Sequence, residues 1–310
     1  MTDQVTVREV GLRDGLQLIQ QIVPANNKLD WCRDQVAAGF TEIEVTSFVP
    51  PSVIPQFADA AEVLEGAKAI AGLRAAVLVL NLKGALRAFD QGAEKIVFVL
   101  SASAAHNLAN VRRPIKDSVT AFRELVAERD RRGLKGTVEI SGAIATAFGC
   151  TIQGEVSERQ VFELVEQLAE AGADELNIAD TVGYADPAQV RRIYGQVAGM
   201  VGKIPLAAHF HDTRGMGLAN VVMALEAGVR RFDASLGGLG GCPFAPGASG
   251  NIATEDCVYL LESMGLATGI DFNRLLTLRE KLDAWLPDEQ LYGRLSKARP
   301  SKIFDPVTIL

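Results

Sequence analysis

The sequence predicts a (β/α)8 barrel, the TIM-barrel fold, with an additional helical segment at the C-terminus. Short runs rich in valine, isoleucine, alanine and phenylalanine alternate with amphipathic segments of helical period along almost the entire chain. Eight such strand–helix repeats occupy about 260 residues, which fits a closed barrel better than an open, doubly wound sheet. The strands are near-continuous apolar runs, as expected for a parallel sheet covered by helices.

The eight predicted strands follow one another at regular intervals. They cover residues 5–10, 42–48, 75–80, 95–100, 137–145, 175–180, 205–211 and 231–236. Helices predicted between them include residues 27–39, 118–133, 157–172 and 215–228. Several of these helices end in glycine, which tolerates the left-handed conformation just beyond a helix. Four turns lead through glycine into a strand in the same way, with the sequences AAGFTEIEV, DQGAEKIVF, AEAGADELN and LEAGVRRFD.

Two further helices are predicted after the eighth strand. Residues 255–265 form the candidate eighth barrel helix, and residues 271–286 have the pattern of one more amphipathic helix, which packs over the barrel or at a subunit contact. No linker or low-complexity segment divides the chain. We therefore expect a single domain over residues 1–310, with the barrel in residues 5–265 and the C-terminal helix and tail in residues 266–310.

Composition excludes several classes of function. The formal net charge of −7 comes without a basic stripe, so nucleic acid is not an expected partner. The N-terminus lacks the pattern of a signal peptide, and no apolar run approaches the roughly 18 residues that span a bilayer. The four cysteines form no CxxC motif, which argues against a disulfide framework or a zinc knuckle. We expect a cytoplasmic protein without a membrane segment.

The sequence AAHFHDTRG, residues 207–215, contains two of the three histidines of the chain. Strand periodicity places His209 and His211 on one face at the carboxyl end of the seventh strand, where the loops of the barrel mouth gather. A single histidine there is more often a hydrogen-bonded structural residue. Two imidazoles that converge on one point, followed directly by Asp212, instead favour metal binding.

An oxygen ligand can come from the sequence GLRDGLQ, which follows the first strand and contains Arg13 and Asp14. A surface turn explains Asp14-Gly15 equally well in isolation. A carboxylate at this place can nevertheless reach across the barrel mouth, which gives two histidines and one carboxylate with open coordination positions. Such a ligand set suits Zn²⁺, Mn²⁺, Fe²⁺ or, less typically, Mg²⁺.

The second strand carries Glu42 and Glu44 on one face. An acidic side chain inside a barrel is costly unless it is paired, and Arg13 on the neighbouring strand is the natural partner for Glu44. This pair would hold the guanidinium near the metal. A simple salt bridge between strands is the alternative interpretation.

The segment 237–251, GGLGGCPFAPGASGN, contains six glycines and suits a loop that opens, closes and approaches a ligand. It lacks the pattern of a nucleotide-binding Walker loop. Within it, Cys242 is a candidate nucleophile or proton donor, although lone cysteines are more often inert. Asn251 is either a cap of the following helix or an amide ligand of the metal.

Together, the motifs EVGLRDGLQ, IEVTSF, NLKG, HFHDTRGMGLAN and GLGGCPFAPGASGNIATEDCVYLLESMG closely resemble the 3-hydroxy-3-methylglutaryl-CoA lyase family. The resemblance covers nearly the whole chain and implies a TIM barrel that cleaves this thioester to acetyl-CoA and acetoacetate in leucine catabolism. It also implies a divalent metal, Mg²⁺ or Mn²⁺ foremost and Zn²⁺ as a further candidate. Members of the family are commonly dimers or larger homo-oligomers.

Site residues follow from the same resemblance. The metal ligands of the family fall on Asp14, His209, His211 and Asn251. Its catalytic arginine falls on Arg13, its loop cysteine on Cys242, and the acidic residue that positions the arginine on Glu44. The implied mechanism places Arg13 at the developing oxyanion and leaves Asp14, His209 and Cys242 as candidates for proton transfer.

Two departures from the family pattern concern the substrate. Ile152 replaces an aromatic residue expected near the acyl pocket, and the segment 101–115 introduces His106, Arg112 and Arg113. A related 3-hydroxy-3-alkylglutaryl-CoA or another 3-hydroxyacyl-CoA is therefore an alternative substrate. Other hypotheses are a condensing or aldolase-type relative, a noncatalytic barrel with a structural metal, and an iron oxygenase.

Overall fold

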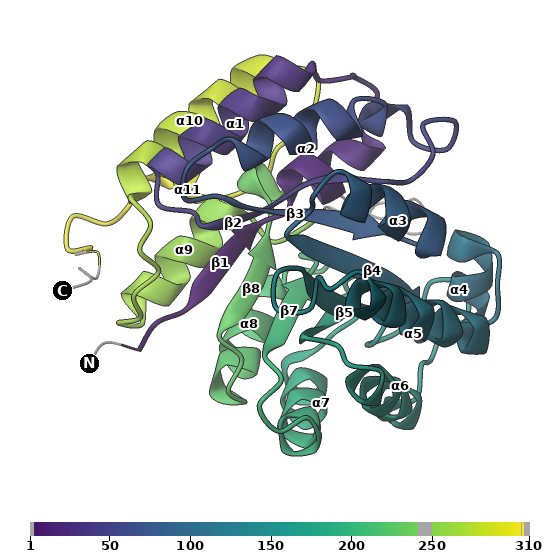
Figure 1. Cartoon of the computed structure of the whole chain (residues 1–310). Coiled ribbons are helices and arrows are strands. Elements are labelled where there is room, and N and C mark those ends of the chain that lie inside the picture. Colours follow the sequence, from purple (N-terminus) through teal and green to yellow (C-terminus); the bar gives the residue numbers. More distant parts are fainter. Residues whose placement is uncertain (1–2, 241–249, 305, 307–310) are drawn as a thin grey trace.

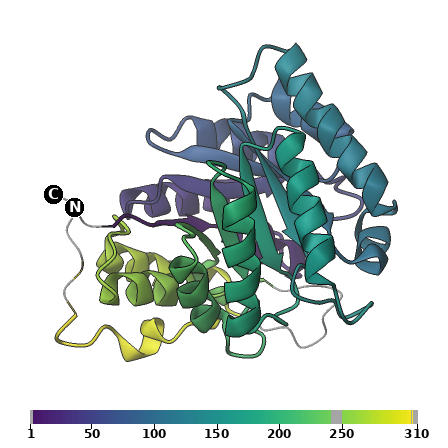
Figure 2. The same ribbon diagram turned by 90° about the horizontal axis from the view of Figure 1, so that it is seen from below.

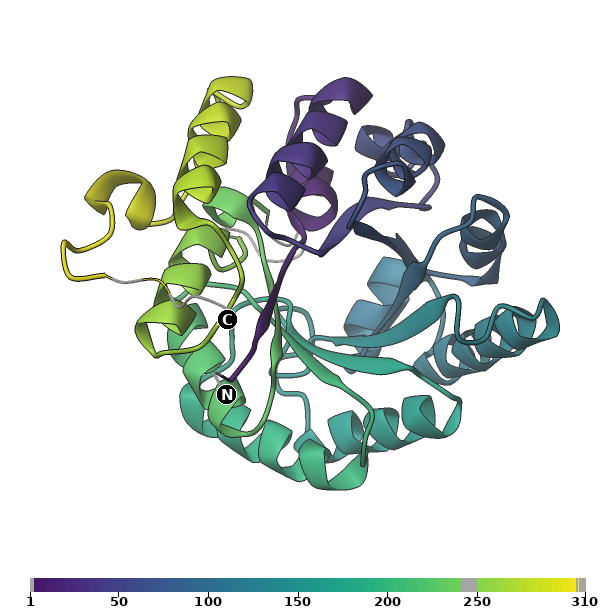
Figure 3. The same ribbon diagram turned by 60° about the vertical axis from the view of Figure 1, so that its left-hand side comes forward.

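The computed structural model describes residues 3–240, 250–304 and 306 of the 310-residue chain. Within these residues, eight parallel strands pair in chain order and close into a barrel, because β8 pairs back to β1. Helices surround the strands on the outside (Figures 1 and 3). The predicted (β/α)8 fold is confirmed.

Each strand lies within its predicted run or extends one residue beyond it. The strands are β1 (Thr6–Glu9), β2 (Glu42–Ser47), β3 (Arg74–Val79), β4 (Lys95–Ser101), β5 (Glu139–Ala145), β6 (Glu175–Asp180), β7 (Leu206–Phe210) and β8 (Arg231–Ala234). The repeated glycine turns are also confirmed, since Gly39, Gly92, Gly172 and Gly228 have φ angles of +104°, +69°, +93° and +97°. Glycine reaches these angles without the steric cost that other residues incur.

The helices that follow the strands form the outer ring. They are α1 (Ala25–Ala37), α2 (Ala60–Lys68), α3 (Leu82–Asp90), α4 (Ala104–Val111), α5 (Ile115–Arg131), α6 (Glu158–Glu170), α7 (Pro187–Met200), α8 (Gly217–Glu226) and α9 (Thr254–Ser263). None of the helices in the described part of the chain is long and apolar enough to cross a membrane. The short helix α4 is an addition between β4 and α5, and it lies at the mouth of the barrel.

The predicted C-terminal helix is present as α10 (Phe272–Trp285), followed by the short α11 (Leu295–Ala298). Helix α10 packs beside α1 and α9 on the outside of the barrel. The C-terminal segment therefore covers one side of the ring and leaves α4 to α7 uncovered (Figures 2 and 3).

A network of buried charges closes the amino-terminal end of the barrel. The Lys95 Nζ atom lies 2.7 Å from Glu42, 2.9 Å from Glu139 and 3.0 Å from Glu175, and Arg8 donates to Glu175 at 2.6 Å. Burial alone would raise the pKa of the Glu175 carboxyl, but Arg8 and Lys95 hold this pKa well below its ordinary value. This network of charges fills the amino-terminal end of the barrel, so the barrel is open at the carboxyl ends of its strands.

Candidate metal centre and active site

The first part of the site is a single helical turn, η1 (Gly11–Gly15), placed directly after β1. The amides of Arg13 and Asp14 donate to the Val10 carbonyl at 3.1 and 2.7 Å, which bends the chain across the barrel mouth. The buried Glu9 carboxylate accepts from the amides of Gly11 and Leu236 at 2.7 and 3.0 Å. Glu9 therefore ties this turn to the end of β8 and fixes its position.

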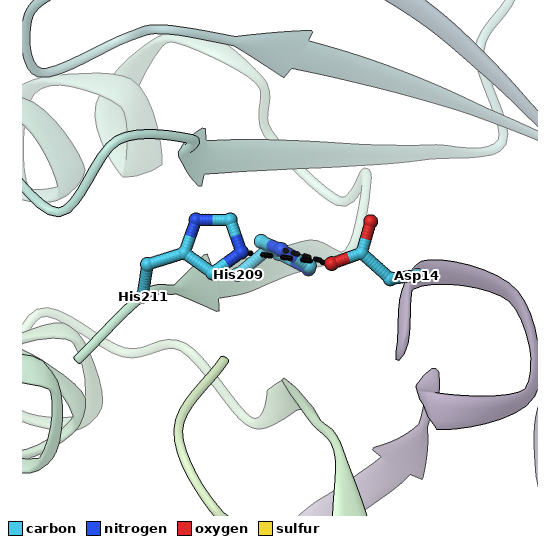
Figure 4. Close-up of side chains that lie close together, drawn as sticks. All are labelled: Asp14, His209 and His211. Carbon is cyan, nitrogen blue, oxygen red and sulfur yellow. Dashed lines mark ion pairs between the residues drawn. The ribbon is translucent and has the colours of Figure 1, made fainter. Parts of the chain in front are cut away.

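Both histidines reach the same point from β7. His209 lies on the strand and His211 just beyond it, and their Nε2 atoms lie 3.8 and 3.5 Å from Oδ2 of Asp14. One potential ligand atom from each of the three residues lies within 4.8 Å of the other two. Figure 4 shows both rings directed at the Asp14 carboxylate. The three residues are buried, with exposed fractions of 8% or less.

In each histidine ring, the contact of Nδ1 fixes the direction in which Nε2 points. His211 Nδ1 lies 2.7 Å from the Thr181 carbonyl oxygen, and His209 Nδ1 lies 3.3 Å from Oδ2 of Asp233. Because a carbonyl and a carboxylate only accept hydrogen bonds, Nδ1 is the protonated nitrogen in both rings. Both Nε2 lone pairs therefore face Asp14, which is the arrangement of metal-bound histidines.

Asn251 reaches the site because the chain after β8 folds back against the end of β7. The Ile252 amide donates to the Phe210 carbonyl at 3.1 Å, and the Asp212 amide donates to the Gly250 carbonyl at 3.0 Å. Gly250 has φ of +89°, and a Cβ atom there would lie 2.3 Å from the Gly238 carbonyl oxygen. A residue with a side chain cannot take this place.

The donor set fits a divalent cation. Asn251 Nδ2 donates to Asp14 Oδ2 at 2.7 Å, whereas the buried Asn251 Oδ1 and His211 Nε2 have no hydrogen-bond partner among the described residues. Buried polar atoms are rarely left without a partner, and a cation would satisfy these two. The capping interpretation of Asn251 does not hold, since α9 begins at Thr254 with Ala253 as its N-cap.

Arg13 lies beside this set. Its guanidinium contacts the Asp14 carboxylate, and Nη2 lies 2.8 Å from Oε2 of Glu44. Burial alone would raise the pKa of the Asp14 carboxyl, but the Arg13 guanidinium in contact with it holds this pKa well below its ordinary value. Asp14 is therefore ionised, as a metal ligand must be.

A cavity of about 760 Å³ opens from these residues to the barrel mouth. His106, Arg112 and Arg113 line it, as the departures in the segment 101–115 suggested. Ile152 is not among the residues that line this cavity, and it is 48% exposed. The loop between β5 and α6 carries it to the surface instead. Cys242 lies outside the described residues.

The comparisons with known proteins agree with this geometry. A family model described as HMGL-like matches residues 4–282. The chain belongs to the HMGL-like family. Among its relatives, the hydroxymethylglutaryl-CoA lyase YngG of Bacillus subtilis is 39% identical over 93% of this chain and 96% of its own. A Pseudomonas aeruginosa relative named 3-hydroxy-3-isohexenylglutaryl-CoA/hydroxymethylglutaryl-CoA lyase is 38% identical over 91% of this chain and 93% of its own.

A solved structure of an HMGL-like relative extends the comparison to three dimensions. The HMG-CoA lyase of Acinetobacter baumannii, in complex with coenzyme A and 3-methylmalate, has a TM-score of 0.91 and 44% sequence identity. The match covers 99% of this chain and 98% of that one.

Sequence reasoning about this HMGL-like chain missed one important residue, Asp233 on β8. Its carboxylate accepts from Arg8 Nε at 2.7 Å and from Asn177 Nδ2 at 2.7 Å, in addition to its contact with His209. Burial alone would raise the pKa of Asp233, but Arg8, His209 and Asn177 lower this pKa to about 2. An acidic residue inside the apolar run RFDASL was the signal that could have identified it.

Proposed function

We propose that this protein is a carbon–carbon lyase that cleaves 3-hydroxy-3-methylglutaryl-CoA to acetyl-CoA and acetoacetate with the help of a divalent cation. The observation that carries the proposal is the convergence of Asp14, His209, His211 and Asn251 on one buried point beside Arg13. Membership of the HMGL-like family and the names of its lyase relatives support the reaction. The coenzyme A complex of the Acinetobacter baumannii enzyme supports a CoA thioester as substrate.

The four ligand residues would hold the cation through two imidazole nitrogens, one carboxylate oxygen and one amide oxygen. A bound cation polarises the 3-hydroxyl of the substrate and lowers its pKa. Arg13 is already fixed by Asp14 and Glu44, so its remaining donor atoms need no reorganisation. Such a donor stabilises the negative charge that develops on the thioester carbonyl oxygen as the carbon–carbon bond breaks.

Two proton transfers complete the reaction. Asp14 is the candidate base for the hydroxyl proton, because a carboxylate has a second oxygen besides the one that would bind the cation. His209, the other residue that the sequence suggests, would have Nε2 on the cation and a protonated Nδ1 on Asp233, so it would have to release one of these contacts to accept a proton. Cys242 is the candidate donor to the new methyl carbon of acetyl-CoA. The wider proposal, supported by the family resemblance, includes Mg²⁺ or Mn²⁺ as the cation, Zn²⁺ as a further candidate, a homo-oligomer, a cytoplasmic location and a role in leucine catabolism.

An assay of the purified protein tests the function. With Mg²⁺ or Mn²⁺ present, we expect 3-hydroxy-3-methylglutaryl-CoA to yield acetyl-CoA and acetoacetate in equal amounts, measured by chromatography and by a coupled dehydrogenase. Removal of the cation with EDTA should abolish turnover, and added Mn²⁺ should restore it. Absence of acetoacetate with the cation present would rule out the proposed substrate.

Asp233 offers a test of how His209 is oriented. Asp233→Asn removes the charge that fixes Nδ1 of His209, so we expect the dissociation constant of Mn²⁺ to rise by about 10- to 100-fold, the usual cost of losing a partner of a metal-bound histidine. Titration calorimetry measures this constant. Glu42→Gln is the matched control, because Glu42 also pairs with Arg8 but does not contact either histidine. Equal Mn²⁺ affinities in the two variants would contradict the role of Asp233.

A further inference from the structure

Thr146, the residue just beyond the end of β5, has an unusual backbone conformation. Its φ angle is +55°, and among the described residues only Arg112 and Arg299 also have a positive φ without being glycine. Both arginines are exposed, whereas Thr146 is fully buried. A positive φ is costly for a side chain that is branched at Cβ, and residues held in this way are concentrated at functional sites. Contacts with the surrounding structure must therefore hold Thr146 in this conformation.

The hydroxyl of Thr146 provides two of these contacts. It donates to the Ala145 carbonyl at 2.7 Å and accepts from the Ser103 amide at 3.1 Å. Ser103 follows β4 and is the N-cap of α4. The side chain of Thr146 therefore ties the end of β5 to the segment that follows β4, and its two hydrogen bonds offset the cost of the positive φ.

The backbone of Thr146 contacts the next strand on the other side. Its amide donates to Oγ1 of Thr181 at 2.7 Å, and Thr181 directly follows β6. The Thr181 carbonyl in turn accepts from Nδ1 of His211 at 2.7 Å. A row of hydrogen bonds thus runs across the carboxyl ends of four consecutive strands, from β4 to β7, and it ends on a ligand residue.

His211 depends on this row for the direction of its ring. Strand β7 ends at Phe210, so pairing with β6 does not extend to residue 211. A bridge to Asn251 holds the His211 backbone, and the Thr181 carbonyl holds the ring. With Nδ1 held in this way, Nε2 lies 3.5 Å from Oδ2 of Asp14 (Figure 4). A shift of the Thr181 carbonyl would turn Nε2 away from the ligand point.

We propose that Thr146 and Thr181 are positioning residues, which hold the His211 imidazole in the direction that cation binding requires. The inference rests on the proposed cation centre and adds two residues to it. Thr146 does not line the cavity, so it acts only through Thr181. Relaxation of Thr146 to a negative φ would move its amide, and Thr181 would then lose its anchor.

The dissociation constant of Mn²⁺, measured by titration calorimetry, tests the role of Thr181. Thr181→Val keeps the shape of the side chain and the backbone carbonyl, but it removes the hydroxyl that anchors the residue. Loss of the direct partner of a metal-bound histidine weakens metal binding by about 10- to 100-fold; since the carbonyl remains here, we expect a rise of about 3- to 10-fold. Thr181→Ser retains the hydroxyl and should bind Mn²⁺ as the wild type does.

Thr213→Val is the matched control. Thr213 lies two residues after His211, and its Oγ1 atom has no hydrogen-bond partner among the described residues. The same substitution there removes a hydroxyl near His211 in the sequence and should leave the Mn²⁺ affinity unchanged. Thermal melting of each variant verifies that it is folded.

Substitution of Thr146 tests the connection between the two threonines. Thr146→Val removes the hydroxyl that holds the residue, so the dissociation constant of Mn²⁺ should rise as it does in Thr181→Val. Because both substitutions break the same connection, the double variant should bind Mn²⁺ no more weakly than Thr181→Val alone. If Thr146→Val does not fold, Thr146→Gly takes its place, because glycine reaches a positive φ freely and also lacks the hydroxyl.

The outcomes separate this inference from the proposed function. If the wild type binds Mn²⁺ and Thr181→Val binds it as tightly as Thr213→Val does, the inference is wrong and the proposed function stands. The same conclusion follows if Thr181→Ser binds Mn²⁺ as weakly as Thr181→Val, or if the losses multiply in the double variant. If the wild type binds no Mn²⁺, the proposed cation centre fails and the inference fails with it.

Discussion

Arg13→Gln is expected to lower kcat by about 10²- to 10³-fold while the protein still binds Mn²⁺. Loss of one preorganised donor to a developing oxyanion typically has an effect of this size. Arg13 is not among the ligand residues, and the histidines and Asn251 keep their own contacts when it is replaced. Steady-state kinetics gives kcat and KM, and titration calorimetry gives the affinity for Mn²⁺.

Two variants sharpen this experiment. Arg214→Gln removes an exposed arginine that stacks on Tyr184 outside the cavity, and it should leave kcat unchanged. Glu44→Gln should lower kcat less than Arg13→Gln does, because the guanidinium stays but loses one of its two anchors. A near-normal kcat in Arg13→Gln would eliminate the oxyanion role. Loss of Mn²⁺ binding would show that Arg13 acts on the ligand set instead.

Asp14→Ala is expected to abolish both cation binding and turnover. The carboxylate lies between the two Nε2 atoms and also accepts from Asn251, so its removal takes away the charged member of the ligand set. The loss of Mn²⁺ affinity should exceed the roughly 10- to 100-fold loss that occurs when a metal-bound histidine loses its hydrogen-bond partner. Titration calorimetry and the acetoacetate assay measure the two effects.

Asp212→Ala is the matched control for Asp14→Ala. Asp212 directly follows His211, but its carboxylate accepts from the Gly217 amide at 2.9 Å at the start of α8. Its loss removes this hydrogen bond, which should cost about 1 kcal/mol of stability, and should leave Mn²⁺ affinity intact. If Asp14→Ala bound Mn²⁺ as well as Asp212→Ala does, the proposed centre would be incorrect.

The sequence predicted the fold well because the barrel follows local rules. Apolar strand runs, helical periodicity and glycine at each helix exit are visible within short windows, and all eight strands lie where these patterns placed them. Helix α4 lacked such a signal. Its eight residues, AAHNLANV, form only two turns, and its N-cap Ser103 is followed by no long periodic run.

The site was predictable only where its residues follow such local rules. Period-two geometry placed His209 and His211 together, and the pairing rule for buried charges connected Arg13 with Glu44. The contact between Asn251 and Asp14 joins residues 237 positions apart and depends on the chain folding back after β8. Asp233 acts through another side chain. Contacts of this kind depend on tertiary structure, so the strand pattern alone does not reveal them.

The pairing of β1 with β8 is the closure point of the barrel, and the ligand residues stand on both sides of it. Asp14 follows β1, whereas His209, His211 and Asn251 belong to the other end of the chain. A cation bound here would therefore link the first and last strands of the barrel. At a cation concentration 100 times the dissociation constant, binding would raise the free energy of unfolding by about 2.7 kcal/mol.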